Sequence, residues 1–148
     1  MYEQQDLSLP KSKTQPFSGC PFCEDRLAGQ IVDAYGCAVA ILDRYPVTPG
    51  HHLVITRRHE DDYFRLSAAE RNDMDHLVRI LKNKIEKEDP TVTGFNIGVN
   101  IGESAGQTVF HVHMHLIPRR DADTQAPRGG VRGVIPGKRS YFDGQDDF

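Results

Sequence analysis

The chain lacks any run of about 20 apolar residues, the length that a membrane-spanning helix requires. It also lacks a strong charge of either sign, because 18 Lys and Arg residues against 21 Asp and Glu residues leave a formal net charge of -3 at pH 7. This balance argues against general binding to nucleic acid or to membrane surfaces. The N-terminal residues show no signal-peptide pattern. We therefore expect a cytoplasmic protein that meets any anionic ligand with local groups.

Cysteine is scarce, and three cysteines cannot all pair with one another. Cys20 and Cys23 are separated by two residues, a spacing more common in metal and redox sites than in secreted disulfide frameworks. Cys37 begins the apolar run 37–42, where a small buried thiol is the better interpretation. The cysteines therefore offer one candidate pair of metal ligands.

The length of 148 residues fits a single domain with one hydrophobic core. Residues 1–19 are polar, contain two prolines and show no periodicity, so we expect a flexible leader. The folded domain is expected over residues 20–118. We expect residues 119–148 to form a partly ordered tail. This tail is basic, because the sequence between positions 119 and 139 contains six Arg or Lys residues and only two Asp residues. A basic tail beside a phosphate site would attract polyanionic substrates. The alternative is that the tail is simply solvated.

Short β-prone runs over residues 30–35 and 37–43 are separated by Gly36, which suits a tight hairpin, and residues 51–56 form a third run rich in β-branched side chains. A capping box at Ser67 and Glu70 precedes apolar residues at helical spacing as far as residue 89. Residues 94–101 and 108–117 are predicted to be strands joined by a small, polar loop. The pattern predicts an α+β domain with an antiparallel sheet of about five strands and one long helix.

Three histidines alternate with apolar residues at the end of this pattern. In a strand the side chains of His111, His113 and His115 share one face, while the intervening side chains point the other way. A single histidine on a strand is most often incidental, but a regular row of three is difficult to explain by packing. Imidazole can act as nucleophile, acid, base or metal ligand, so the row alone leaves its chemistry open.

The segment before the histidines contains groups suited to an anion. Amide and hydroxyl donors stand beside glycines that let the backbone approach a ligand, as a phosphate cradle requires. A plain hairpin turn would explain the glycines equally well. The candidate residues are Asn100, Gly102, Gly106, Gln107 and Thr108.

Residues 111–117 match without exception the signature His-φ-His-φ-His-φ-φ, where φ is apolar, and the chain therefore resembles the histidine triad (HIT) family. The likeness continues through the cysteine pair, Asp43, and the segments 49–51, 53–55, 57–59 and 100–108. It covers about residues 20–118 and is similar to bacterial members with an N-terminal pair of cysteines. The resemblance implies a HIT-like fold and a mechanism through a nucleotidyl-histidine intermediate.

The resemblance assigns roles by position. His113 would be the nucleophile that attacks the α-phosphorus, and a backbone carbonyl in the glycine loop would hold its tautomer. Asp43 would bind the ribose hydroxyls, while Leu42 and Ile31 could wall the base or belong to the core. The remaining residues of the expected site complete catalysis or hold phosphate oxygens: His111, His115, His51, Asn100, Gly106, Gln107 and Thr108.

The same resemblance implies a structural zinc ion held by Cys20, Cys23, His59 and His111. The alternative is two reduced cysteines in a turn beside an exposed His59. A catalytic metal on the histidine row is a further alternative, but no carboxylate is evident near the row in the sequence.

The leading hypothesis is therefore a nucleotide hydrolase or nucleotidyl transferase acting on the α-phosphate of adenosine phosphoesters, dinucleoside polyphosphates or phosphoramidates. It would bind a purine nucleotide, adenosine above all, and the family likeness implies a homodimer. The alternatives are a nucleotide-binding regulatory module with little catalysis and a zinc-held interaction domain. The last leaves His113 and His115 unexplained, and no residue pattern decides the leaving group or the base.

Overall fold

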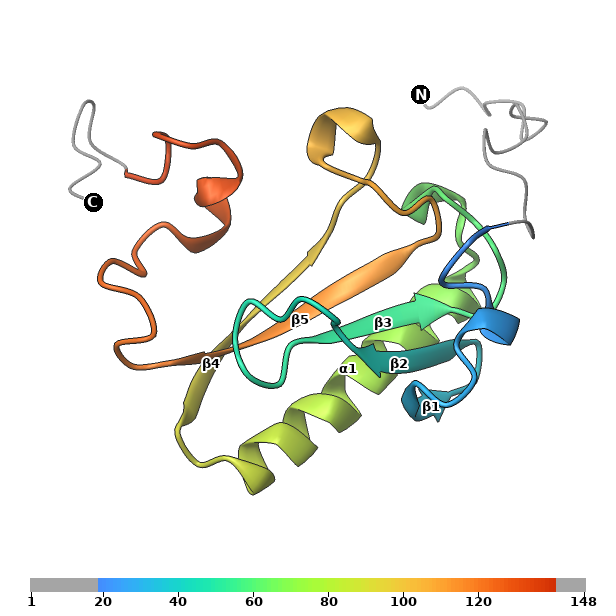
Figure 1. Ribbon diagram of the computed structural model, residues 1–148, viewed down its shortest axis with the longest axis horizontal. Helices are drawn as coiled ribbons and strands as arrows, with labels where there is room; N and C mark the ends of the chain where they lie inside the picture. Colours follow the sequence, from blue (N-terminus) through green and yellow to red (C-terminus); the bar gives the residue numbers. More distant parts are fainter. Residues whose placement is uncertain (1–18, 141–148) are drawn as a thin grey trace.

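The computed structural model describes residues 19–140 of the 148-residue chain. Most of the expected leader and the last eight residues of the expected tail lie outside that range. Within it, a single antiparallel sheet has the strand order β1-β2-β3-β5-β4 (Figure 1). The predicted α+β class, with one long helix and five strands, is confirmed. The strands and the helix are β1 (Ile31–Tyr35), β2 (Ala38–Leu42), β3 (His52–Thr56), α1 (Ala68–Glu88), β4 (Val92–Val99) and β5 (His113–Arg120).

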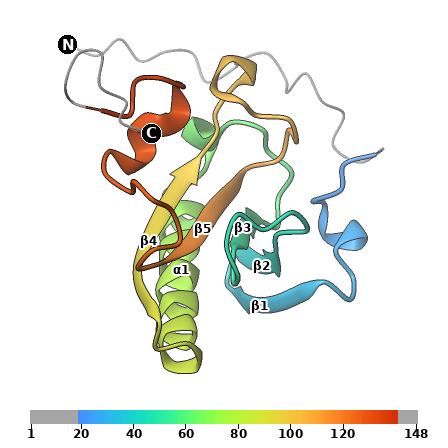
Figure 2. The same ribbon diagram turned by 60° about the vertical axis from the view of Figure 1, so that its left-hand side comes forward.

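Helix α1 lies across one face of the sheet (Figure 2). The predicted capping box is present, because the Ser67 side chain accepts from the Glu70 backbone and the Glu70 side chain accepts from the Ser67 backbone. The apolar side of the helix packs on side chains from β2, β3 and β5, including Val54 and Leu116. No helix in the range 19–140 is long and apolar enough to cross a membrane.

The opposite face of the sheet is apolar at its centre and carries histidines beside this apolar surface. Leu53 and Ile55 of β3 belong to a second buried cluster that includes Leu27 from the N-terminal segment. In the antiparallel register of β3 and β5, His115 stands opposite Leu53 and His113 opposite Ile55. Cross-strand partners share a face, so both imidazoles lie next to aliphatic side chains rather than in a polar row.

The last strand differs from its prediction at both ends, since it runs from His113 to Arg120 instead of from residue 108 to 117. It begins late because the Val112 amide donates to the Glu60 carbonyl (2.7 Å), outside the sheet. It continues through Pro118 to Arg120 because pairing with β4 extends that far, although pairing with β3 ends at Leu116. His111 therefore precedes the strand that carries the other two histidines. Strand β4 likewise runs over residues 92–99, not 94–101.

The helix–sheet contact predicts a test of the core. Leu77 is fully buried in the α1 interface (0% exposed), and Leu77→Ala should lower the free energy of unfolding by about 2–5 kcal/mol through lost burial and a cavity. Leu42 is 54% exposed, so Leu42→Ala is the matched control and should cost less than about 1 kcal/mol. Urea denaturation followed by circular dichroism would measure both. Equal losses in the two variants would contradict this account of the core.

Candidate functional site

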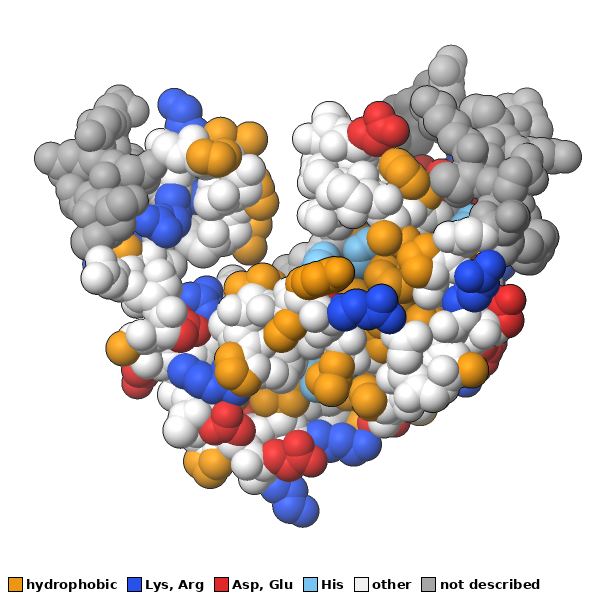
Figure 3. Space-filling view, in the orientation of Figure 1, with side chains coloured by type: hydrophobic (Ala, Val, Ile, Leu, Met, Phe, Trp, Pro, Cys, Tyr) orange, Lys and Arg blue, Asp and Glu red, His pale blue; other side chains and the backbone are white. Residues whose placement is uncertain are grey.

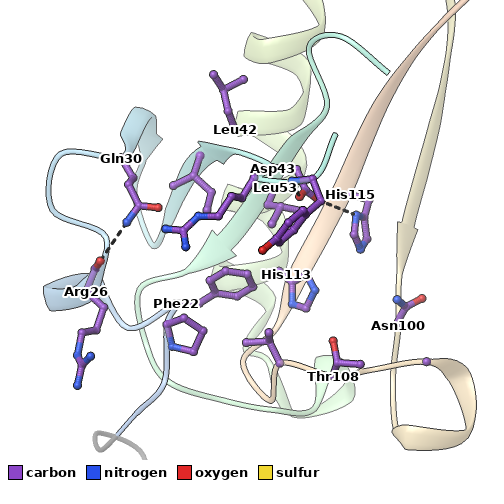
Figure 4. Close-up of a pocket in the computed structure, with 16 residues that line it drawn as sticks. Phe22, Arg26, Gln30, Leu42, Asp43, Leu53, Asn100, Thr108, His113 and His115 are labelled. Atoms are coloured by element: carbon purple, nitrogen blue, oxygen red, sulfur yellow. Dashed lines mark hydrogen bonds and ion pairs between the residues drawn. The ribbon is translucent and has the colours of Figure 1, made fainter. Parts of the chain in front are cut away.

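A cavity of about 520 Å³ opens on the sheet face that carries the histidines. Histidine side chains lie at the floor of a hollow flanked by hydrophobic side chains (Figure 3). His113 and His115 lie at one side of the cavity, and Arg26 and Gln30 lie at the other (Figure 4). Among the residues expected from the sequence, the lining includes Leu42, Asp43, Asn100, Gly106, Thr108, His113 and His115.

His113 is held in one tautomer by its neighbour's backbone. Its Nδ1 lies 2.8 Å from the carbonyl oxygen of His111. A carbonyl only accepts, so Nδ1 carries the proton and Nε2 has the free electron pair. Burial lowers the pKa of His113, which keeps the ring neutral at pH 7. The tautomer was predicted, but the carbonyl that holds it belongs to His111 and not to the glycine loop.

His111 points away from the cavity lining toward the cysteines. Its Nε2 donates to the carbonyl oxygen of Thr56 (2.7 Å), so the unprotonated nitrogen is Nδ1. That Nδ1 lies 3.4 Å from Cys20 Sγ and 3.8 Å from Cys23 Sγ. The His111 side chain is fully buried, and burial lowers its pKa to about 4. The ring of His111 is therefore neutral, and the free electron pair of its Nδ1 faces the two thiols.

The four predicted metal ligands meet at one point, although they come from three separate segments. The ligand atoms of Cys20, Cys23, His59 and His111 all lie within 4.8 Å of one another. Cys23 Sγ is 3.3 Å from His59 Nδ1. The observed sulfur–nitrogen distances fit a shared tetrahedral zinc ion, for which bond lengths of about 2.3 and 2.0–2.1 Å place sulfur and nitrogen roughly 3.5 Å apart.

The chemistry of this donor set also fits a cation. Burial, with Cys20 as its close neighbour, raises the pKa of Cys23 to about 12. A bound zinc ion reverses that preference, because a coordinating thiol is deprotonated. Such an ion would be four-coordinate and closed, so its contribution here would be structural.

Asp43, His51 and His115 form a second cluster beside the cavity. His51 Nε2 lies 2.9 Å from His115 Nδ1 and 3.4 Å from an oxygen of Asp43. The same Asp43 oxygen is 4.0 Å from His115 Nδ1. The sequence showed no carboxylate near the histidine row, and the fold supplies one from the end of β2.

The hydrogen bonds of His51 decide what this cluster can do. The Val47 amide donates to His51 Nδ1 (3.0 Å), so the proton of the neutral ring is on Nε2. A protonated Nε2 cannot ligate a metal; it donates to His115 Nδ1 instead. His115 consequently carries its own proton on Nε2. Burial lowers the pKa of both His51 and His115, and the cluster is a directional hydrogen-bond chain rather than a metal site.

The glycine loop reaches the cavity through alternate residues. Gly102 and Gly106 have φ angles of 88° and 92°, a region that favours glycine. Asn100, Gly106 and Thr108 line the cavity, as the phosphate-cradle hypothesis requires. Gln107 is buried and is not part of that lining, so the structure does not bring its side chain to the other expected phosphate contacts.

Several cavity residues were not predicted from the sequence. The Phe22 ring meets His113 edge-on, with ring centroids 4.9 Å apart. Phe22 stands between the two cysteines, and that position was its only signal. Ile41 rather than Ile31 is the isoleucine of the lining. The remaining unexpected polar or aromatic lining residues are Arg26, Gln30, Arg44 and Tyr45.

Comparison with known proteins agrees with this geometry. The sequence profile of the HIT domain matches residues 28–122. An uncharacterised HIT-like protein of Saccharolobus solfataricus is 38% identical over 130 residues, which cover 84% of this chain and 90% of that protein. An AP-4-A phosphorylase of Mycobacterium tuberculosis is 31% identical over 140 residues, covering 90% of this chain and 68% of the relative.

Solved structures share both the fold and part of the sequence. A zinc-bound histidine triad family protein from Mycobacterium smegmatis superposes with a TM-score of 0.65 at 30% identity, over 73% of this chain and 80% of the other. Plasmodium falciparum diadenosine triphosphate hydrolase, solved with cyclomarin A, gives a TM-score of 0.60 at 30% identity, over 66% and 65% of the two chains.

The Cys/His cluster predicts a metal dependence that differs among the cysteines. Purified protein should contain about one zinc ion per chain by elemental analysis, the stoichiometry of a closed four-ligand site. Cys23→Ser should lose the ion and unfold at a lower temperature, because metal binding to such a site adds to folding free energy. Cys37→Ser is the control, since Cys37 lies outside the cluster. Zinc far below one per chain in the unmodified protein would contradict this assignment.

Proposed function

This chain belongs to the HIT domain family, and we propose that it is a nucleotide hydrolase or nucleotidyl transferase acting at the α-phosphorus of adenosine phosphoesters or phosphoramidates. One observation carries the proposal. The Nδ1–H group of His113 donates a hydrogen bond to the carbonyl of His111, and this leaves Nε2 unprotonated on a side chain that lines the cavity. A neutral imidazole in this tautomer is a good nucleophile at pH 7.

In the first step, His113 Nε2 forms a bond to the α-phosphorus as the bond from phosphorus to the leaving group breaks. The leaving group departs with that electron pair and takes up a proton from solvent. His115 offers its Nε2 proton as a hydrogen bond to an oxygen on which negative charge increases, and Thr108 offers a hydroxyl. Donors that are fixed before the reaction stabilise such charge without reorganisation.

In the second step, an acceptor oxygen replaces the imidazole on phosphorus. If the acceptor is water, the product is the nucleoside monophosphate, and a proton returns to solvent. Asp43 lines the same cavity, and its carboxylate suits the two neighbouring hydroxyls of a ribose. The apolar wall formed by Leu42 and Leu53 suits a purine base.

The relatives support substrates that contain an adenosine polyphosphate. The names AP-4-A phosphorylase and diadenosine triphosphate hydrolase describe dinucleoside polyphosphates with two different acceptors, inorganic phosphate and water. We propose that a zinc ion on Cys20, Cys23, His59 and His111 supports this site structurally. The cytoplasmic location stays a prediction from composition.

The nucleophile assignment predicts the outcome of one assay. His113→Ala should reduce AMP release from diadenosine tetraphosphate and from adenosine 5′-phosphoramidate by at least about a thousandfold, the scale of loss when a nucleophile is removed. His76→Ala is the control, because His76 is an exposed helix residue stacked on Tyr35. Unmodified protein that binds AMP but releases none from either substrate would favour the binding-module alternative.

Product analysis distinguishes the two acceptors in the same assay. When inorganic phosphate is added, attack by phosphate on the nucleotidyl-histidine gives ADP, whereas attack by water gives AMP. We expect AMP as the main product, and a shift to ADP would assign the chain to the phosphorylase activity.

We also propose that two copies pair through β4, in line with the predicted homodimer. Strand β4 is at the edge of the sheet among the described residues, and its Ile97 is 49% exposed. An unpaired strand edge of this length is a template for another strand. Light scattering should give twice the chain mass, and Ile97→Lys should shift the protein toward the monomer. A monomeric mass for the unmodified chain would contradict the proposal.

A further inference from the structure

The Gln107 side chain has no donor left for a substrate. Its Nε2 donates to the carbonyl oxygens of Asp61 (2.9 Å) and Val109 (3.2 Å), which uses both of its N–H groups. Its Oε1 accepts from the Gly102 amide (2.8 Å). The residue is only 6% exposed. Oε1, an acceptor, would repel the oxygens of a phosphate. A direct contact between the Gln107 side chain and phosphate is therefore unfavourable.

The Asp61 carbonyl that accepts from Gln107 belongs to a segment that also contacts the histidine row. Residues 56–61 supply the Thr56 carbonyl to His111, the Glu60 carbonyl to the Val112 amide, and the Asp61 carbonyl to Gln107. The same segment contains His59, one of the four residues of the Cys/His cluster. The glycine loop and the cluster are therefore attached to one short stretch of chain.

We propose that Gln107 is a positioning residue that holds the glycine loop against the segment 56–61, so that Gly106 and Thr108 meet the phosphate beside His113. This inference rests on the proposed function. Gly106 and Thr108 are the sequence neighbours of Gln107 and line the cavity. Both are exposed, so their own contacts do not anchor the loop as the buried amide between them does.

The benefit of the anchor is geometric. A misplacement of about 1 Å in groups that hold a reacting phosphate costs on the order of a hundredfold in rate. Two glycines with positive φ make the loop easy to deform, because glycine allows many backbone conformations. The Gln107 amide closes this loop on itself through Gly102 and attaches it outward through Asp61.

The shared segment also makes the loop sensitive to the metal. His59 and Asp61 are two residues apart, so a cation on the Cys/His cluster restrains the stretch that Gln107 grips. Loss of the cation should loosen the loop in the absence of any nucleotide, and it should do so through Gln107.

The test measures amide hydrogen exchange by NMR in the nucleotide-free protein, together with kcat and KM for AMP release. Gln107→Met should raise exchange at residues 102 and 107 by at least about fivefold, the effect of a lost hydrogen bond, and lower kcat/KM about 10- to 100-fold. Gln107→Glu keeps an acceptor for Gly102 but loses both donors, so it should raise exchange at residue 107, spare residue 102 and lower kcat/KM as well. Ser104→Ala is the matched control, since Ser104 is exposed on the same loop.

Chelation supplies the second measurement. Removing metal from unmodified protein should raise exchange over residues 102–107, whereas chelation should add nothing in Gln107→Met. Loop exchange that chelation leaves unchanged in the unmodified protein would overturn the link to the cluster.

Activity loss in both Gln107 variants with unchanged exchange would mean that Gln107 meets the substrate directly, and the positioning role would be wrong. Unchanged kcat/KM in both variants would overturn it too. If Gln107→Met does not fold, Gln107→Glu carries the same comparison. Exchange that rises as expected in a protein whose unmodified form releases no AMP would support the anchor while contradicting the proposed function.

Discussion

Three backbone groups decide which ring nitrogen of each buried histidine carries its proton, and the chemistry of the site depends on those three choices. A neutral imidazole has one donor and one acceptor, so fixing one nitrogen fixes the other. The Thr56 carbonyl turns Nδ1 of His111 to the cysteines, and the His111 carbonyl frees Nε2 of His113. The Val47 amide sets His51 and, through it, gives His115 a proton on Nε2. One residue type thereby supplies the proposed metal ligand, the proposed nucleophile and a hydrogen-bond donor.

The sheet makes these choices consistent with a stable fold. Helix α1 and its apolar contacts cover one face, and this leaves the other free to hold imidazoles beside Leu53 and Ile55. Burial there lowers the pKa values of His113 and His115, and a neutral ring costs less to bury than an imidazolium. Each buried ring nitrogen that carries a proton needs an acceptor. The backbone supplies it for His111 and His113, and the ring of His115 supplies it for His51.

The sequence predicted the parts of this arrangement that depend on local periodicity. Alternation placed His113 and His115 on one face of a strand, and helical spacing with a capping box placed α1 to within a residue. Contacts between distant segments were not predictable in this way. Nothing local indicates that Asp43 comes within 4.0 Å of His115, or that the Val112 amide leaves the sheet for the Glu60 carbonyl. The family resemblance implied the cluster of two cysteines and two histidines. It did not indicate that Gln107 uses both of its side-chain N–H groups within the protein.

The spacing of the cysteines has a second consequence beyond ligation. Two thiolates separated by two residues can hold one ion only if the chain between them turns tightly, and that turn contains Phe22. The ring of Phe22 lies edge-on to His113 and also packs against the apolar cluster of Leu53 and Ile55. An ion at Cys20 and Cys23 would therefore fix the aromatic ring that packs against the proposed nucleophile, although the ion itself would lie outside the cavity. A metal could in this way be structural and still shape the reaction, because the residues that would bind it also place the ring that contacts His113.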